Sequence, residues 1–108
     1  MPSDKAYLEF VLEQLAGLDG ITFRPMMGEY LLYRHGILFG GIYDNRFLVK
    51  QVPAALRLMP DAPREIPYEG AKAMLLVEEL ENPDFLCRLI PAIAEELPPP
   101  KTRRPKRS

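Results

Sequence analysis

The sequence has little that would support redox, metal or membrane chemistry. Its 108 residues include a single cysteine, Cys87, and a single histidine, His35. One cysteine excludes an internal disulfide and a multi-cysteine zinc site, and one histidine excludes a metal site built on a histidine pair. No apolar run approaches the roughly 18 residues of a membrane helix. The first residues also lack the basic segment and apolar core of a signal peptide, so we expect a cytoplasmic protein.

Motifs for nucleotide binding and catalysis are equally scarce. No glycine-rich loop leads into Lys-Ser or Lys-Thr, and Gly36, Gly40 and Gly41 lie among the expected strands instead of at a strand-to-helix turn. His35 lies in a turn-like pair, where an exposed side chain is the simpler interpretation, because a general base would need an acid partner. Cys87 falls beside an apolar helical stripe, which favours a buried, unreactive thiol over a reactive one with a cationic neighbour. We therefore expect no enzyme, no cofactor and no metal.

What is present is typical of one small globular domain. The apolar fraction of 47% is compatible with a single hydrophobic core and excludes wholesale disorder. The net charge of −1 conceals an asymmetry, because residues 98–108 hold five cations and no acid, which leaves a charge of −6 on residues 1–97. Four prolines in that last segment oppose a helix. We predict a folded domain over 1–97 and a disordered, Pro-rich basic tail over 98–108.

The hydrophobic pattern predicts two longer helices and a short one. Apolar residues recur at helical spacing over 4–18, with Ser3 as the N-cap. A second amphipathic stripe follows Asn82, a favourable cap, and Pro83, a favourable first residue. Residues 54–59 have helical propensity between two prolines, and the following residues 60–70 are expected to form a loop.

Between the helices the apolar pattern becomes that of short strands. His35-Gly36 and Asp44-Asn45 favour tight turns because Asn, Asp and Gly tolerate positive φ. Gly40-Gly41 inside one run indicates a bulge or the close approach of another group. The expected strands occupy residues 21–27, 30–33, 37–43, 46–50 and 72–77.

Consecutive strands with tight connections form an antiparallel sheet, and two amphipathic helices must cover one of its faces. The sequence therefore predicts a two-layer α+β domain. It has a sheet of about four to five strands with helices on one face, in the order α-β-β-β-β-α-β-α.

Several side-chain groups have more than one interpretation. Four methionines favour a role as fillers of irregular core gaps, although an adaptable contact surface is the alternative. Tyrosines strengthen that alternative, because tyrosine is common at interfaces. Four acids near the last helix fit a solvated loop at its N-terminus better than a metal site. These groups are Met26, Met27, Met59 and Met74; Tyr30, Tyr33 and Tyr43; and Glu78, Glu79, Glu81 and Asp84.

Two sets of cations are candidates for binding. Arg24 and Lys50 alternate with apolar residues and would project from one sheet face, where a structural role is the simpler interpretation. With Lys72 they would hold an anion at a small-molecule site or enzyme site only if a cavity were lined by at least two of the three; otherwise no small-molecule ligand is expected. The tail offers weak, salt-sensitive binding to nucleic acid. Its cations are Lys101, Arg103, Arg104, Lys106 and Arg107.

An ordered set of segments carries one further pattern. The segments are Arg24-Pro25-Met26-Met27-Gly28-Glu29-Tyr30, Leu32-Tyr33, Gly36, Leu38-Phe39-Gly40-Gly41-Ile42, Phe47-Leu48-Val49-Lys50, Pro67-Tyr68-Glu69-Gly70-Ala71-Lys72 and Glu81-Asn82-Pro83. Over residues 21–97 they resemble the N-terminal domain family of the TfoX/Sxy competence and transcription regulators. The matching motif positions are Arg24, Met26, Gly28, Tyr30, Tyr33, Gly36, Lys50, Tyr68 and Lys72. Met27 and Glu29 depart from that pattern, in which Phe and Gly are usual.

The resemblance implies a two-layer α+β domain that is non-enzymatic and has a regulatory or protein-interaction role. We expect a homodimer or a complex with a protein partner. The second domain of the full-length regulators is absent from this chain, so their complete role is not carried over. The alternative is an accessory nucleic-acid binder that acts through the basic tail.

Overall fold

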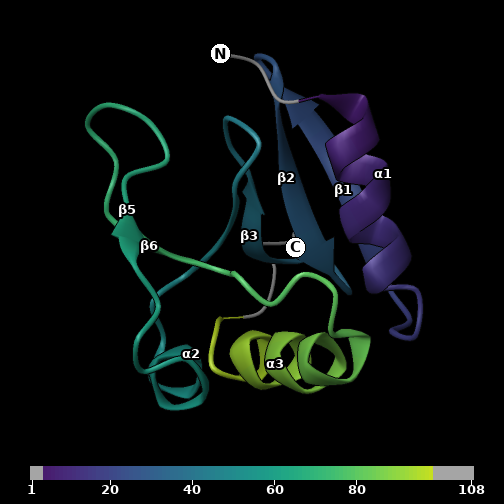
Figure 1. Ribbon diagram of the computed structural model, residues 1–108, viewed down its shortest axis with the longest axis vertical. Helices are drawn as coiled ribbons and strands as arrows, with labels where there is room; N and C mark the ends of the chain where they lie inside the picture. The colour runs from purple at the N-terminus through teal and green to yellow at the C-terminus, as the bar shows by residue number, and fades with distance from the viewer. Residues whose placement is uncertain (1–3, 99–108) are drawn as a thin grey trace, which may run out of the picture.

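Six strands form one antiparallel sheet in the computed structural model, which describes residues 4–98. The strands lie in the order β1-β2-β3-β4-β6-β5 (Figure 1). Their bounds are β1 Ile21–Met26, β2 Glu29–Arg34, β3 Ile37–Ile42, β4 Phe47–Val49, β5 Arg64–Glu65 and β6 Met74–Leu76. The helices are α1 Lys5–Gln14, α2 Pro53–Leu58 and α3 Pro83–Glu95. The predicted α+β class is confirmed, with more strands than expected.

The additional strand is β5, which lies inside the residues expected to form a loop. Arg64 pairs with Leu75 and Glu65 with Met74, so β5 forms the edge of the sheet beside β6. Its two residues carry no recognisable apolar alternation. The side chain of Arg46, next to β4, donates to the Glu65 carboxylate at 2.6 Å, so a contact distant in sequence supports this strand.

The ends of the helices agree in part with the sequence. The side chain of Asn82 accepts a hydrogen bond from the backbone N–H of Phe85 at 3.2 Å, which confirms the predicted cap of α3. Helix α1 ends at Gln14, earlier than expected, and turns continue to Leu18. Asp4 occupies its N-cap position, whereas Ser3, the residue expected there, lies outside the described residues.

The predicted tight turns are confirmed by the backbone. His35 and Gly36 have φ of 50° and 81°, and Asp44 and Asn45 have φ of 54° and 56°. Two consecutive residues with positive φ give a turn whose twist matches that of the flanking strands. The same pattern occurs at the β1–β2 turn, where Met27 and Gly28 have φ of 52° and 87°.

Gly40 and Gly41 combine both features proposed for them. The pairing of β2 with β3 shifts between Leu32 and Tyr33, which leaves Phe39 as the extra residue of a bulge. A Cβ atom on Gly40 would overlap the carbonyl oxygen of Leu48, and one on Gly41 would lie 2.7 Å from the carbonyl oxygen of Tyr30. The glycines therefore allow the neighbouring backbones to approach.

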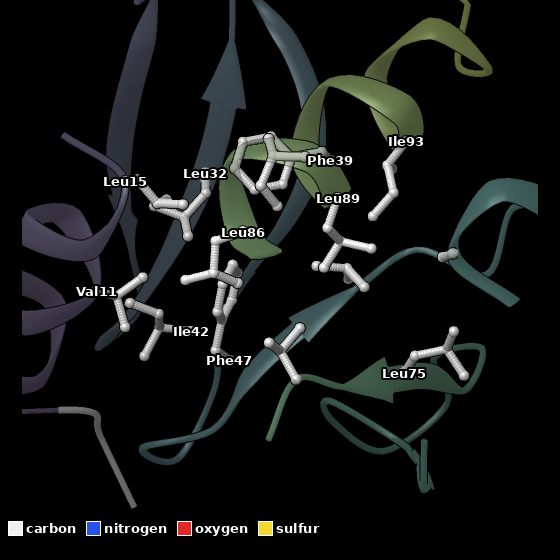
Figure 2. Packing of buried hydrophobic residues seen from close by; sticks show 14 of the residues in the cluster. Val11, Leu15, Leu32, Phe39, Ile42, Phe47, Leu75, Leu86, Leu89 and Ile93 are labelled. Atoms are coloured by element: carbon white, nitrogen blue, oxygen red, sulfur yellow. The ribbon is translucent and has the colours of Figure 1, made fainter. Parts of the chain in front are cut away.

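The hydrophobic core lies between one face of the sheet and the helices. Figure 2 shows side chains from α1, the strands and α3 meeting there. Fully buried members include Val11 of α1 and Leu15 directly after it, Phe39, Phe47 and Leu75 of the sheet, and Leu86, Leu89 and Ile93 of α3. Because side chains alternate along a strand, the residues between these core positions project from the opposite face, called the open face below.

The two edges of the sheet differ from its interior. Strand β1 has Pro25 as the fifth of its six residues, and proline has no backbone N–H to offer to a further strand. At the other edge, β5 is only two residues long. Both edges therefore offer short or interrupted templates for strand addition.

Candidate ligand-binding cavity on the open face

The open face contains a cavity of about 730 Å³. This volume lies within the range of roughly 300–1,000 Å³ that is usual for small-molecule sites. The segment 67–73, which connects β5 to β6, contributes one part of the lining and the sheet contributes another. The connection rises as a loop at the upper left of Figure 1. The lining residues are Met26, Leu31, Leu38, Gly40, Tyr43, Lys50, Gln51, Val52, Pro67, Tyr68, Ala71, Lys72, Ala73, Met74 and Leu97.

Two cations line the cavity, and they are two of the three candidates from the sequence. Lys50 is half-buried and Lys72 is exposed, and none of the lining residues is acidic. Arg24 is exposed and pairs across β1 and β2 with Leu31, which places it on the same face but outside the lining. The condition set for a small-molecule site, a cavity lined by at least two of these cations, is therefore met.

Gln51 holds together the two segments that carry the lysines. Its side-chain amide donates to the carbonyl oxygen of Ala73 at 2.9 Å, and its side-chain oxygen accepts from Nε of Arg64 at 3.2 Å. The backbone N–H of Lys50 donates to the carbonyl oxygen of Phe39 at 3.0 Å. These bonds hold the backbone on either side of the cavity, so the backbone atoms of the two lysines have defined positions.

Two tyrosines lie beside each other at the cavity. The ring of Tyr43 is almost fully buried, whereas Tyr68 is 56% exposed, and their centroids are 6.1 Å apart. Burial, with smaller contributions from Tyr68, Glu29 and Tyr33, raises the pKa of Tyr43 to about 12. The Tyr43 hydroxyl is therefore protonated and uncharged near neutral pH, where it is a hydrogen-bond donor and not a base.

The nine family-motif residues do not all gather at one place. Four of them line the cavity: Met26, Lys50, Tyr68 and Lys72. Tyr33 lies in β2 but does not line the cavity, and Gly28 and Gly36 lie in the turns between strands. The ring of Tyr30 stacks edge-on against Phe23, with centroids 6.0 Å apart. The five tail cations lie outside the described residues.

The interpretation of the methionines needs a correction. Met27 is 96% exposed at the tip of the β1–β2 turn, so it fills no core gap. Met59 packs against the core as expected, whereas Met26 and Met74 line the cavity. The sequence could not separate these roles, because Met27 directly follows an apolar run and therefore looks like one more residue of the strand, although it lies in the turn.

His35 has an acid partner that the sequence did not reveal. Its Nε2 lies 3.6 Å from Asp19, whose other carboxylate oxygen accepts from Arg34 at 2.9 Å. A backbone hydrogen bond within Asp19, followed by the charges of His35 and Arg34, lowers the pKa of this carboxyl. The His35 side chain is 53% exposed and does not line the cavity, in agreement with an exposed turn residue.

The remaining candidates lie apart from the cavity. Cys87 is half-buried, and its Sγ would lie 3.1 Å from a Cβ on Gly17. The four acids near α3 are exposed, and Glu79 accepts from the side chain of Asn82 at 3.2 Å. Within residues 4–98, no group of histidine, cysteine and acidic side chains is arranged to hold a metal ion.

Fold and cavity together define a small α+β domain with a ligand-sized hollow on the uncovered face of its sheet. The chain belongs to the same family as an uncharacterized 12.7 kDa protein in the trpE 5′ region of Spirochaeta aurantia. The two are 32% identical over 108 residues, which span 98% of this chain and 93% of the relative. No protein-family model and no solved structure matches the chain. None of the helices in the described part of the chain has the length and apolar character needed to cross a membrane.

Proposed function

We propose that this chain is a non-enzymatic regulatory domain that acts by binding through its open face. The proposal follows the resemblance to the N-terminal domain of the TfoX/Sxy regulators. The observation that carries it is the cavity, whose lining combines apolar, tyrosine and lysine side chains on the face that the core leaves uncovered. Such a lining is suited to holding a partner group.

The chemistry of the lining supports binding over catalysis. No histidine, cysteine or carboxylate is among the lining residues, so three common sources of a general base or nucleophile do not face the cavity. The buried Tyr43 keeps its proton, because its pKa is raised to about 12. The remaining polar groups of the lining can orient a bound group through hydrogen bonds and charge.

The proposed partner is a second copy of the chain. Ile66 and Tyr68 are each 56% exposed in and beside the segment that borders the cavity, and exposed large apolar side chains near a hollow favour protein contact. Sedimentation velocity of the full chain should show a dimer that dissociates in Tyr68→Glu. Met27→Glu is the matched control, because Met27 is exposed at a turn outside the cavity lining. A monomer at every concentration of the unaltered protein would contradict self-association.

The tail supports a second candidate function, accessory binding of nucleic acid. Its five cations contrast with the charge of −6 on the rest of the chain. Replacing all five by glutamine in the full chain should abolish binding to duplex DNA at low salt. For the unaltered protein, the logarithm of the binding constant should fall with the logarithm of salt concentration with a slope of at most about 4.5. Equal binding by both proteins, or by neither, would end this hypothesis.

A further inference from the structure

We propose that the cavity on the open face binds a small amphipathic anion, whose negative group lies between Lys50 and Lys72 and whose apolar body contacts the sheet. The inference deepens the proposed function and rests on one part of it, binding through the open face, and not on the proposed self-association. The ligand is defined by two features only, an apolar or aromatic body and a carboxylate, sulfonate or phosphate group.

The distribution of charge is the first argument. The chain up to residue 97 has fifteen acids and nine cations, yet the cavity lining has two lysines and no acid. Among residues 4–98 there is just one other lysine, Lys5, which lies on α1. A concave, partly apolar site strengthens the field of the charges that line it. The cavity is therefore a locally positive place on a negative domain.

The state of the two ammonium groups is the second argument. Within the described part of the chain, neither Lys50 nor Lys72 forms an ion pair, whereas Arg34 pairs with Asp19 and Arg46 with Glu65. The lysine charges are thus available to a ligand without the loss of an internal partner. A lysine acts as a point charge, so it accepts carboxylate, sulfonate and phosphate alike.

Acids that project from the same face are directed elsewhere. The Glu29 carboxylate accepts the backbone N–H of Asp44 at 3.0 Å, at the β3–β4 turn. The Glu65 carboxylate accepts from Arg46 at 2.6 Å. Both belong to strand positions paired with methionines of the lining, Met26 and Met74, but neither lines the cavity. The charge of Glu29 still reaches Tyr43, whose pKa it helps to raise, but both carboxylates accept hydrogen bonds from groups outside the lining.

The apolar part of the lining accounts for the body of the ligand. Leu31 and Leu38 of the sheet face the cavity, together with the two methionines, whose flexible thioethers adapt to varied shapes. Tyr43 adds an aromatic surface and a hydroxyl that is uncharged near neutral pH. The connecting segment makes the site concave, with Pro67 buried, which favours a compact molecule over an extended peptide.

The test is a fluorescence titration of the full chain with 8-anilino-1-naphthalenesulfonate, an aromatic sulfonate. We expect saturable binding of one probe per chain. Lys50→Met and Lys72→Met should each weaken binding by about fivefold or more, while Lys50→Arg and Lys72→Arg should retain it. Lys5→Met is the matched control and should bind as the unaltered protein does. N-phenyl-1-naphthylamine, which lacks the sulfonate, should bind the methionine variants and the unaltered protein equally.

Competition and sedimentation complete the design. Displacement of the probe by 1-naphthoate, by 1-naphthyl phosphate and by inorganic phosphate distinguishes a carboxylate ligand, a phosphate ester and a free anion. Equal probe affinity in all lysine variants, or no saturable binding to the unaltered protein, would overturn the inference. Circular dichroism of each variant excludes unfolding as the cause of a lost signal. An unaltered protein that forms a dimer but shows no saturable anion binding would contradict this inference alone, whereas anion binding by a protein that is always monomeric would contradict only the proposed self-association.

Discussion

At the scale of single residues, two adjacent glycines show how a short sequence pattern encodes close packing. Gly40 and Gly41 are required by space, since neither has positive φ and a Cβ on either would meet backbone oxygen atoms of a neighbouring strand. The sequence predicted this place because glycine weakens the interior of a strand unless a bulge or a close backbone contact requires it. It could not reveal which strand approaches, since that depends on the pairing with β4 and β2.

Gly40→Ala should therefore destabilise the protein by about 2–3 kcal/mol through overpacking. Gly70→Ala is the control, because Gly70 has φ of 88° but open space around it, so the added methyl group introduces backbone strain without overlap. That strain costs about 1–2 kcal/mol. Urea denaturation of both variants measures the free energies of unfolding. A smaller loss in the Gly40 variant than in the Gly70 variant would show that the strands separate at little cost.

Tyr43 is a residue whose ionisation the fold suppresses. Its pKa of about 12 exceeds the usual value near 10, so the folded protein keeps a proton that the unfolded chain loses. The contribution of this protonated hydroxyl to the free energy of unfolding is fully present below pH 10 and is lost as the pH rises from about 10 to about 12. Tyr43→Phe should lose less thermal stability than the unaltered protein across this interval. Identical melting profiles against pH would contradict the raised pKa.

At the scale of elements, the last helix was the most predictable part of the chain. Asn82 and Pro83 mark its start, and its apolar stripe is buried as expected, including Leu86, Leu89 and Ile90. These signals are local, because capping and helical periodicity involve residues three or four positions apart. The helix continues through Pro91 to Glu95.

The cap of α3 gives a direct test of this local encoding. Asn82→Ala should lower the free energy of unfolding by about 1 kcal/mol, because the N–H of Phe85 loses its acceptor. Asn82→Ser should cost much less, since serine caps about as well as asparagine. Chemical denaturation of the two variants measures the difference, and equal stabilities would mean that the side-chain bond is dispensable.

Strand β5 illustrates what local patterns cannot encode. Arg46, distant in sequence, supports this strand by pairing with Glu65 and by donating to the carbonyl oxygen of Ile66 at 3.4 Å. Arg46→Met should loosen this edge, and amide hydrogen exchange at Leu76, whose N–H donates to Pro63, should become faster. Exchange at Val49, which pairs on the other side of β6, should change little. Unaltered exchange at Leu76 would show that the backbone pairing with β6 is sufficient to stabilise β5 without Arg46.

At the scale of the whole molecule, the sequence predicted the class and the layers better than the site. Helical and strand periodicities determine which faces are apolar, and two amphipathic helices then have one place to pack. The cavity is different, because Lys50 and Lys72 are far apart in sequence and line the same cavity only through the path of the segment between β5 and β6. The spacing of the two lysines matches no motif. The sequence therefore supplied the condition for a site, a cavity lined by at least two of the three cations, but could not predict that such a cavity exists.

The boundary of the folded unit can be placed from contacts at the end of α3. The Glu96 carboxylate accepts the backbone N–H of Ala54 in α2 at 2.8 Å, and Leu97 packs against the core. A chain ending at residue 98 should therefore melt at the same temperature as the full chain. A chain ending at residue 95 should melt several degrees lower, by about 4–8 °C for each kcal/mol lost. Thermal denaturation followed by circular dichroism compares the three, and equal midpoints would move the boundary inward.

The edges of the sheet have a consequence for behaviour in concentrated solution. Pro25 interrupts hydrogen bonding along β1, and β5 offers only two residues, so neither edge is a long template for recruiting further chains. Growth of the sheet from molecule to molecule, the step that leads to fibrils, is hindered at both ends. A protein with such edges can expose one face of its sheet to solvent without becoming prone to precipitation.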